Sequence, residues 1–249
     1  MSSKSQADPL APLMDLPGVA EASETARAAV ARAHRHRVNL RGWPESAAEA
    51  AVRAARASSV LDGGSLSMSA DGQPDAVLAG ALRVAEALEG GATALVGVWQ
   101  HAPLQAIARL HALAAADLTD SATLGQPRSG VGRRLELLGD IVTSGTRVPA
   151  PVLAAVAHGE LLTLAPFGVA DGVVARAVAR LISITSGLDP HGLAVPEVYW
   201  MRESSDYRAA ARGFASGTPD GLAVWVITSC LALEDGAREA LAIAEASSG

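Results

Sequence analysis

The sequence predicts a mostly α-helical fold. Apolar residues recur at helical spacing in one segment after another, alanine is abundant throughout, and aromatic residues make up only 3% of the chain. Strands are disfavoured because they draw on Val, Ile, Tyr, Phe and Thr. With 249 residues, of which 49% are hydrophobic, the chain can bury the core of one large soluble domain, or of one domain with a helical extension.

Charge and cysteine content limit the partners and the compartment. The chain has 20 Lys and Arg against 26 Asp and Glu, a net charge of −6 without a basic block, so neither nucleic acid nor a membrane is an expected partner. It contains no run of 18 apolar residues and no apolar signal-peptide core. The single Cys230 lies in an apolar run, where a buried thiol is expected, and this fits a reducing cytoplasm.

The N-terminal part begins with a leader, followed by helices. Residues 1–17 mix polar residues and Pro without periodicity, which predicts a flexible leader. Residues 19–37 carry Ala and Val at helical spacing and end in a basic cluster, which favours the negative end of a helix. The next helix is predicted over residues 46–61, because Ser46 and Glu49 have the spacing of a capping box.

The group of N-terminal helices is expected to extend over residues 18–100. An amphipathic pattern predicts a helix over residues 75–88, which Gly90-Gly91 ends. The segment of residues 96–99 is short, and we expect it to form a strand or an extended link.

A helical core is expected over residues 101–249. Residues 103–118 begin with Pro in the first turn and carry a regular apolar stripe. The remaining predicted helices cover residues 131–141, 149–164, 206–215 and 222–246. Residues 197–207 hold both Tyr residues of the chain and one Trp, either as fillers of a core of small residues or as stacking surface.

The chain is organised around a helix–loop–helix. Apolar stretches over residues 158–164 and 173–184 flank the loop APFGVADG, whose Pro and Gly break the helical pattern. Asp171 is the expected N-cap of the second helix. Free N–H groups and the positive end of the helix dipole then suit an anion such as phosphate, with Arg176 one turn away.

These residues resemble the signature of the Fic (Fido) family, His-Pro-Phe-x-(Asp/Glu)-Gly-Asn-Gly-Arg-x-x-Arg. Aligned on Pro166-Phe167, the signature has Ala165 at its catalytic His and Val169 at its metal-binding acid. The other signature positions fall on Ala170 and Asp171 (Gly-Asn), Gly172 (the second Gly), Val173 (the first Arg) and Arg176 (the second Arg).

The resemblance implies a Fic-like helical core and a degenerate site. In the family, AMP is transferred from a nucleotide to a hydroxyl of a target protein; the His takes the proton, the acid holds Mg²⁺, and backbone amides and Arg hold phosphates. Ala165 and Val169 can supply neither base nor metal ligand, so no catalytic residue and no Mg²⁺ are expected. The residues retained for phosphate or nucleotide binding would be Phe167, Gly168, Ala170, Asp171, Gly172 and Arg176.

A second partial match lies at the end of the predicted helix over residues 46–61. Ser58 to Gly63 resembles the family's inhibitory motif, (Ser/Thr)-x-x-x-Glu-(Gly/Asn), with Asp62 in place of Glu. In the family that Glu pairs with the second Arg of the signature and obstructs the terminal phosphate. The resemblance therefore implies that Asp62 faces Arg176, directly or through a water because Asp is one methylene shorter. The alternative is an ordinary helix end, with Gly63 as its cap.

Three functions follow as hypotheses. The leading one is a catalytically degenerate Fic-like protein that binds ATP, another nucleotide or another anion, or only a protein partner. The second is an active protein adenylyltransferase with an unrecognised base, such as His158 or Asp171. The third is a structural helical homo-oligomer. His158 lies two helical turns ahead of Ala165 and is expected to be structural.

Overall fold

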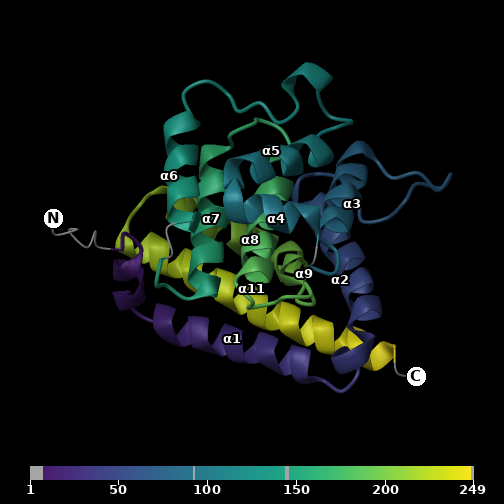
Figure 1. Cartoon of the computed structure of the whole chain (residues 1–249), viewed down its shortest axis with the longest axis horizontal. Coiled ribbons are helices and arrows are strands. Elements are labelled where there is room, and N and C mark those ends of the chain that lie inside the picture. Colours follow the sequence, from purple (N-terminus) through teal and green to yellow (C-terminus); the bar gives the residue numbers. More distant parts are fainter. Residues whose placement is uncertain (1–7, 92, 144–145, 248–249) are drawn as a thin grey trace.

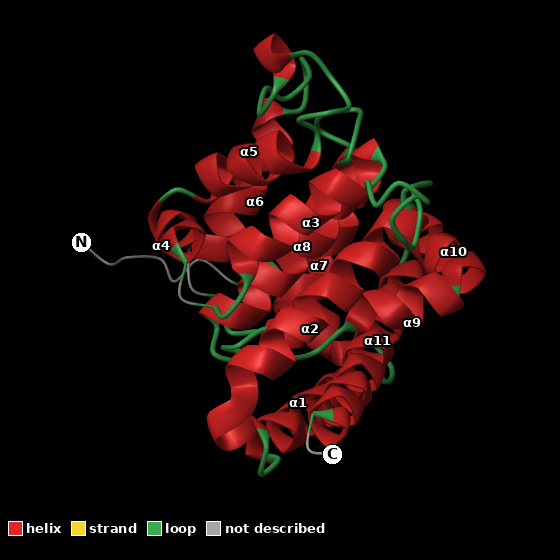
Figure 2. Ribbon diagram, turned by 90° about the vertical axis from the view of Figure 1, so that its right-hand side faces the viewer, coloured by secondary structure: helices red, strands yellow, loops and turns green. Residues whose placement is uncertain are grey.

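The computed structural model describes residues 8–91, 93–143 and 146–247. Within these ranges the chain forms eleven α-helices and two short 3-10 helices, without a strand (Figure 2). The 3-10 helices are η1 (Ala11–Asp15) and η2 (Ser121–Thr123). The α-helices are α1 (Val19–Arg35), α2 (Asn39–Leu61), α3 (Ala76–Leu88), α4 (Ala94–His101), α5 (Pro103–Ala114), α6 (Gly132–Thr143), α7 (Ala150–Leu164), α8 (Asp171–Thr185), α9 (Pro196–Arg202), α10 (Ser204–Ala215) and α11 (Pro219–Ala246). The expected mostly α fold is confirmed.

The helices α7 and α8 form a hairpin at the centre of the molecule (Figure 1). Most side chains of both helices are buried, because other helices cover the hairpin on several sides. Gly159 allows a close approach: a Cβ there would lie 2.7 Å from the indole nitrogen of Trp225 on α11. This burial explains why the two segments read as apolar runs in the sequence.

Long N- and C-terminal helices support the hairpin from one side. The helices α1 and α11 lie side by side along the lower edge of Figure 1, and α11 also packs on α7, α9 and α10. The Trp225 indole of α11 donates a hydrogen bond of 2.7 Å to the Ala155 carbonyl of α7. One face of the hairpin is thereby fixed to the C-terminal helix.

The other side of the hairpin is covered by α2 to α6. Leu95 and Trp99 of α4 pack in one cluster with Ile107 of α5 and with residues of α8. The expected boundary between residues 100 and 101 therefore does not separate two hydrophobic cores. Among the described residues, no helix is long and apolar enough to cross a membrane.

Three predicted elements are corrected by the structure. The second helix begins at Asn39, with Pro44 inside it, so Ser46 is buried in the helix interior and makes no cap. The predicted strand over residues 96–99 lies in the helix α4, because Leu95 and Trp99, four residues apart, are buried by neighbouring helices. The helix from Pro103 ends at Ala114, four residues earlier than expected.

The predicted leader is ordered where the structure describes it; residues 1–7 lie outside the described residues. Leu10 is buried, and the Asp8 carboxylate accepts hydrogen bonds from the Arg147 amide at 2.7 Å and the Thr146 hydroxyl at 2.8 Å. These hydrogen bonds lower the pKa of Asp8. Asp8 therefore fastens the start of the described chain to the loop before α7.

Candidate functional site

The loop between α7 and α8 is held in an unusual backbone conformation. Ala165 at the end of α7 has φ 41°, and Ala170 just before α8 has φ 55°. Residues other than glycine rarely adopt this left-handed backbone conformation, which costs about 1–2 kcal/mol per residue. The residue at the N-cap position is Ala170, so the expectation that Asp171 is the N-cap is wrong.

Asp171 instead closes the loop on itself. Its carboxylate accepts the N–H groups of Phe167 at 2.9 Å and Gly168 at 2.7 Å. Burial raises the pKa of Asp171, and the two hydrogen bonds oppose that rise. An internal carboxylate thus occupies the amides of Phe167 and Gly168 near the start of the loop.

A second carboxylate, from Asp62 at the end of α2, covers the start of α8. It accepts the Val173 N–H at 2.9 Å and the Arg176 guanidinium at 2.7 Å. A Cβ on Gly172 would lie only 2.2 Å from a carboxylate oxygen of Asp62, so the glycine permits this approach. The predicted pairing of Asp62 with Arg176 is confirmed, and the contact is direct, with no water between the two groups.

Arg176 is an interior charge, and each of its three side-chain nitrogens has a hydrogen-bond partner. Its side chain is 2% exposed and donates to the Ser58 hydroxyl at 2.8 Å, the Ser58 carbonyl at 3.0 Å and the Tyr207 hydroxyl at 3.3 Å. Burial alone would lower the pKa of this guanidinium, but Asp62 and Tyr207 raise it above its usual value. Arg176 is therefore charged throughout the physiological pH range.

One of these partners carried no clear signal in the sequence. Tyr207 belonged to the aromatic group whose role was left open, and the structure places it on α10 as a partner of Arg176. Gly63 has φ 87°, and a Cβ placed there would have no neighbouring atom within 4 Å. It serves the chain reversal after α2.

Arg128 clamps the other side of the loop. Its backbone N–H donates to the Pro166 carbonyl at 2.8 Å, and its guanidinium donates to the carbonyls of Leu164 and Ala165. The positive charge thus lies at the C-terminal end of α7, where the helix dipole is negative. The Phe167 ring is held in place because it stacks on the His111 ring, with the two centroids 3.9 Å apart.

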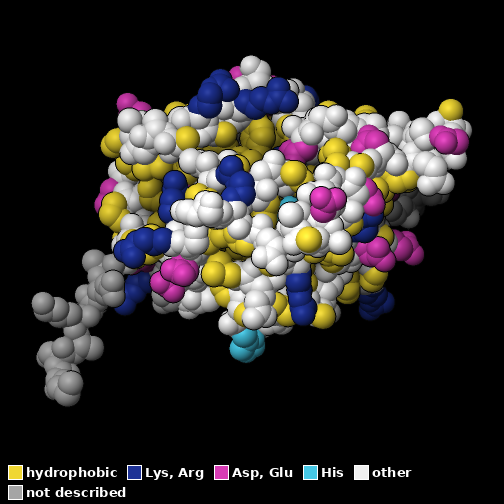
Figure 3. All heavy atoms as spheres, turned by 90° about the horizontal axis from the view of Figure 1, so that it is seen from above, with side chains coloured by type: hydrophobic (Ala, Val, Ile, Leu, Met, Phe, Trp, Pro, Cys, Tyr) yellow, Lys and Arg dark blue, Asp and Glu magenta, His cyan; other side chains and the backbone are white. Residues whose placement is uncertain are grey.

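The face that carries this loop is seen from above in Figure 3. Lys and Arg side chains lie mostly on one half of it, and Asp and Glu mostly on the other half.

The site lacks the groups for base and metal catalysis at the two aligned positions. Ala165 has no proton-accepting side-chain atom, and Val169 has no metal ligand. In the described part of the chain, no three His, Cys, Asp or Glu residues are grouped so that they could hold a metal ion.

His158 does not lie in the loop. It is fully buried, and its Nε2 hydrogen-bonds the Tyr207 hydroxyl at 2.9 Å. Burial and the nearby Arg176 charge lower the pKa of His158, so its ring is neutral at physiological pH. Its expected structural position is confirmed.

Comparison with known proteins identifies this arrangement of helices. No model of a protein family and no curated protein matches the sequence. Among solved structures, Fic-1 (residues 134–508) from C. elegans aligns over 94% of this chain and 73% of its own, with a TM-score of 0.69 and 17% identity. A Fic family protein from Desulfovibrio desulfuricans G20 aligns over 91% and 74%, with a TM-score of 0.62 and 16% identity.

The chain has the Fic fold. The likeness covers nearly all of the chain, including the N-terminal helices that deliver Asp62. Within this fold, the loop between α7 and α8 leads into a helix that starts at Asp171 and carries the buried Arg176. Carboxylates of the chain itself accept N–H groups at both ends of this segment: Asp171 accepts that of Phe167, and Asp62 accepts that of Val173.

Proposed function

We propose that this protein is a catalytically degenerate Fic-fold protein that acts as a binding or regulatory module. The observation that carries the proposal is that the chain's own carboxylates occupy the loop. Asp171 accepts the Phe167 N–H, and Asp62 accepts both the Val173 N–H and the Arg176 guanidinium. Donors held in this way are not presented to a phosphate ligand until the carboxylates move.

Loss of the base and the metal ligand supports the same proposal. General acid–base catalysis contributes about 10²–10⁴-fold to a rate, and a catalytic metal several kcal/mol more. Ala165 and Val169 supply neither, and His158 is held by Tyr207 inside the core. Asp171 is held by two amides of its own loop, so neither alternative base is free.

The ligand that suits the site is a phosphate-bearing group such as that of a nucleotide, and it binds when Asp62 leaves. The Arg176 guanidinium and the amide of Val173 would then each lose the acceptor that Asp62 provides, and an anion can take its place. The remaining loop residues, Phe167, Gly168, Ala170 and Gly172, would form the wall of this site. A protein partner that moves the end of α2 would have the same effect.

The single buried Cys230 fits a reducing compartment such as the cytoplasm. A measurement of the protein's mass in solution shows whether it forms a homo-oligomer.

Two assays test the proposal. Thermal unfolding with ATP, ADP, AMP and inorganic phosphate, each with and without Mg²⁺, should show stabilisation that does not depend on Mg²⁺. Labelled ATP with a cell lysate should give no labelling above background. Ala165→His alone should not restore labelling, since Val169 and Val173 remain. Robust labelling by the wild-type protein would overturn the proposal that the site is catalytically degenerate.

A further inference from the structure

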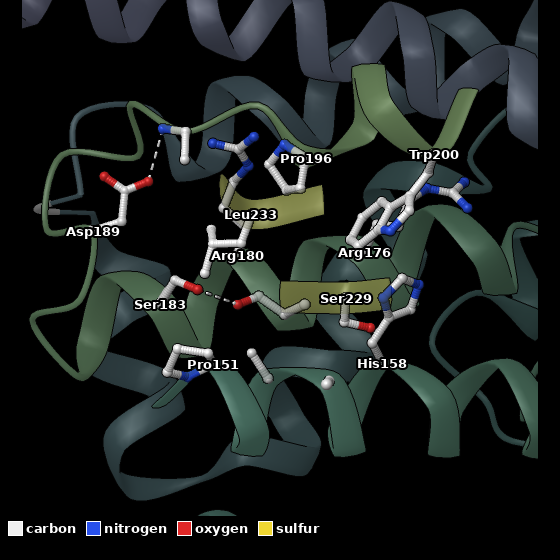
Figure 4. Close-up of a pocket in the computed structure, with 14 residues that line it drawn as sticks. Pro151, His158, Arg176, Arg180, Ser183, Asp189, Pro196, Trp200, Ser229 and Leu233 are labelled. Atoms are coloured by element: carbon white, nitrogen blue, oxygen red, sulfur yellow. Dashed lines mark hydrogen bonds between the residues drawn. The ribbon is translucent and has the colours of Figure 1, made fainter. Parts of the chain in front are cut away.

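A small cavity lies behind Arg176, on the side away from the loop. It has a volume of about 40 Å³ and is lined by residues of α7, α8, α9 and α11 and of the segment between α8 and α9. Figure 4 shows the lining side chains His158, Trp200 and Ser229 close together on one side of the cavity. Arg176 also lines it. The cavity is therefore separated from the candidate anion site by one buried side chain.

Three buried polar atoms at this cavity lack hydrogen-bond partners within the described residues: His158 Nδ1, Trp200 Nε1 and Ser229 Oγ. The residues that carry them are 0%, 3% and 8% exposed. An unpaired polar atom in such a place costs about 1–3 kcal/mol. Three of them on one cavity wall indicate a shared partner.

The hydrogen-bond chain from Arg176 decides which of these atoms are donors. Arg176 donates to the Tyr207 hydroxyl, so that oxygen accepts there. Burial raises the pKa of Tyr207, which keeps its proton, and the nearest acceptor for that proton is His158 Nε2 at 2.9 Å. The neutral ring of His158 then carries its own proton on Nδ1.

The cavity thus presents two N–H donors and one hydroxyl. The His158 Nδ1–H and the Trp200 Nε1–H can only donate, whereas the Ser229 hydroxyl can also accept. A ligand must accept twice and donate at least once. A water molecule has this capacity, and about 40 Å³ suffices for it, because a water needs about 10–15 Å³ of such space.

We infer that this cavity is a binding site for an ordered internal water. The water accepts from His158 Nδ1–H and Trp200 Nε1–H and donates to Ser229 Oγ. It joins α7, α9 and α11 and ends the chain of hydrogen bonds that begins at Arg176. The site is independent of the proposed function, since no step of it involves the anion loop.

The test combines nuclear magnetic resonance with crystallography. In protein labelled with ¹⁵N, the His158 ring should have the Nδ1–H tautomer, and the Trp200 indole proton should show a rotating-frame Overhauser contact at the water frequency. A crystal structure should show density within hydrogen-bond distance of all three atoms.

A matched pair of variants makes the test specific. Ser229 and Ser183 both line the cavity, but the Ser183 hydroxyl already donates to the Ala179 carbonyl at 3.0 Å. Ser229→Ala should weaken or abolish the water contact of the Trp200 indole proton, and Ser183→Ala should leave it unchanged. A Nε2–H tautomer of His158, a cavity without water density, or equal effects of the two variants would overturn the inference.

Discussion

Replacing Asp62 by Ala tests the link between the end of α2 and the loop. The change removes the carboxylate that pairs with Arg176 at 2.7 Å and accepts the Val173 amide at 2.9 Å. Arg176 is 2% exposed, so its charge cannot turn to solvent. We therefore expect the Asp62→Ala variant to fold less stably and to bind anions more tightly than the wild type.

The size of the effect follows from the two lost interactions. Removing one partner of a buried ion pair costs about 3–5 kcal/mol, and losing a helix cap costs about 1 kcal/mol. The Asp62 side chain is 19% exposed, and Arg176 keeps Ser58 and Tyr207 as acceptors. The total should therefore lie near the lower end of the summed range, about 4 kcal/mol, which lowers Tm by roughly 8–16 °C in a chain of this length.

The assay is denaturant and thermal unfolding, with Asp75→Ala as the control. Asp75 caps α3 by accepting the Leu78 amide at 2.9 Å, and it also accepts the Ser65 amide at 2.6 Å, but it is paired with no arginine among the described residues. Its loss should cost only about 1 kcal/mol. The difference between the two variants measures the ion pair.

Inorganic phosphate provides the second readout. It should raise the Tm of the Asp62→Ala variant more than that of the wild type or of Asp75→Ala, because an anion can take the place of the lost carboxylate beside Arg176. Equal destabilisation by the two substitutions, together with no extra response to phosphate, would refute the reasoning. Asp62 would then be an ordinary helix end.

Three further predictions concern single sites. Gly172→Ala should displace the Asp62 carboxylate, 2.2 Å from the new Cβ, and should increase phosphate binding in calorimetric titration as Asp62→Ala does. Gly159→Ala should destabilise by about 1–3 kcal/mol in urea unfolding, because its Cβ would meet an indole nitrogen at 2.7 Å, whereas Gly97→Ala, with no atom within 4 Å, should stabilise by about 0.5–1 kcal/mol. Burial alone would raise the pKa of Asp189, but hydrogen bonds from a histidine ring and two backbone amides lower it below 3.8; its stabilisation is present above pH 3.8 and is lost as pH falls through the lower folded pKa. Asp189→Asn should therefore be less stable at pH 7 and lose less stability on acidification than the wild type, as measured by unfolding across pH.

Most of the helical fold could be predicted because its signals are local. Alanine content, apolar spacing and the Pro and Gly residues that interrupt it act within a few residues. These local signals gave wrong predictions where tertiary packing determined the structure. Ser46 lies inside α2, since the burial of that face outweighs the capping preference, and α4 replaces an expected strand because neighbouring helices bury Leu95 and Trp99.

The sequence by itself determined which residue types stand in the loop, and hence that Ala165 and Val169 offer no base and no metal ligand. It also placed Asp62 and Arg176 as partners, through two partial motifs. What only the tertiary structure decided is which acceptor each donor meets. The last amides of the loop were predicted to be free, but the Val173 amide at the helix start donates to Asp62, and Asp171 folds back on the amides of Phe167 and Gly168.

The physical reason is that hydrogen-bond pairing in a core depends on side chains brought together from distant elements. The Val173 amide and Asp62 are 111 positions apart, and His158 and Tyr207 are 49 apart. No local pattern states which oxygen will fill a given site, because burial forces every donor to take the acceptor that packing leaves within reach. Sequence thus specified the chemistry available to the loop, and packing specified that the chain's own carboxylates occupy it.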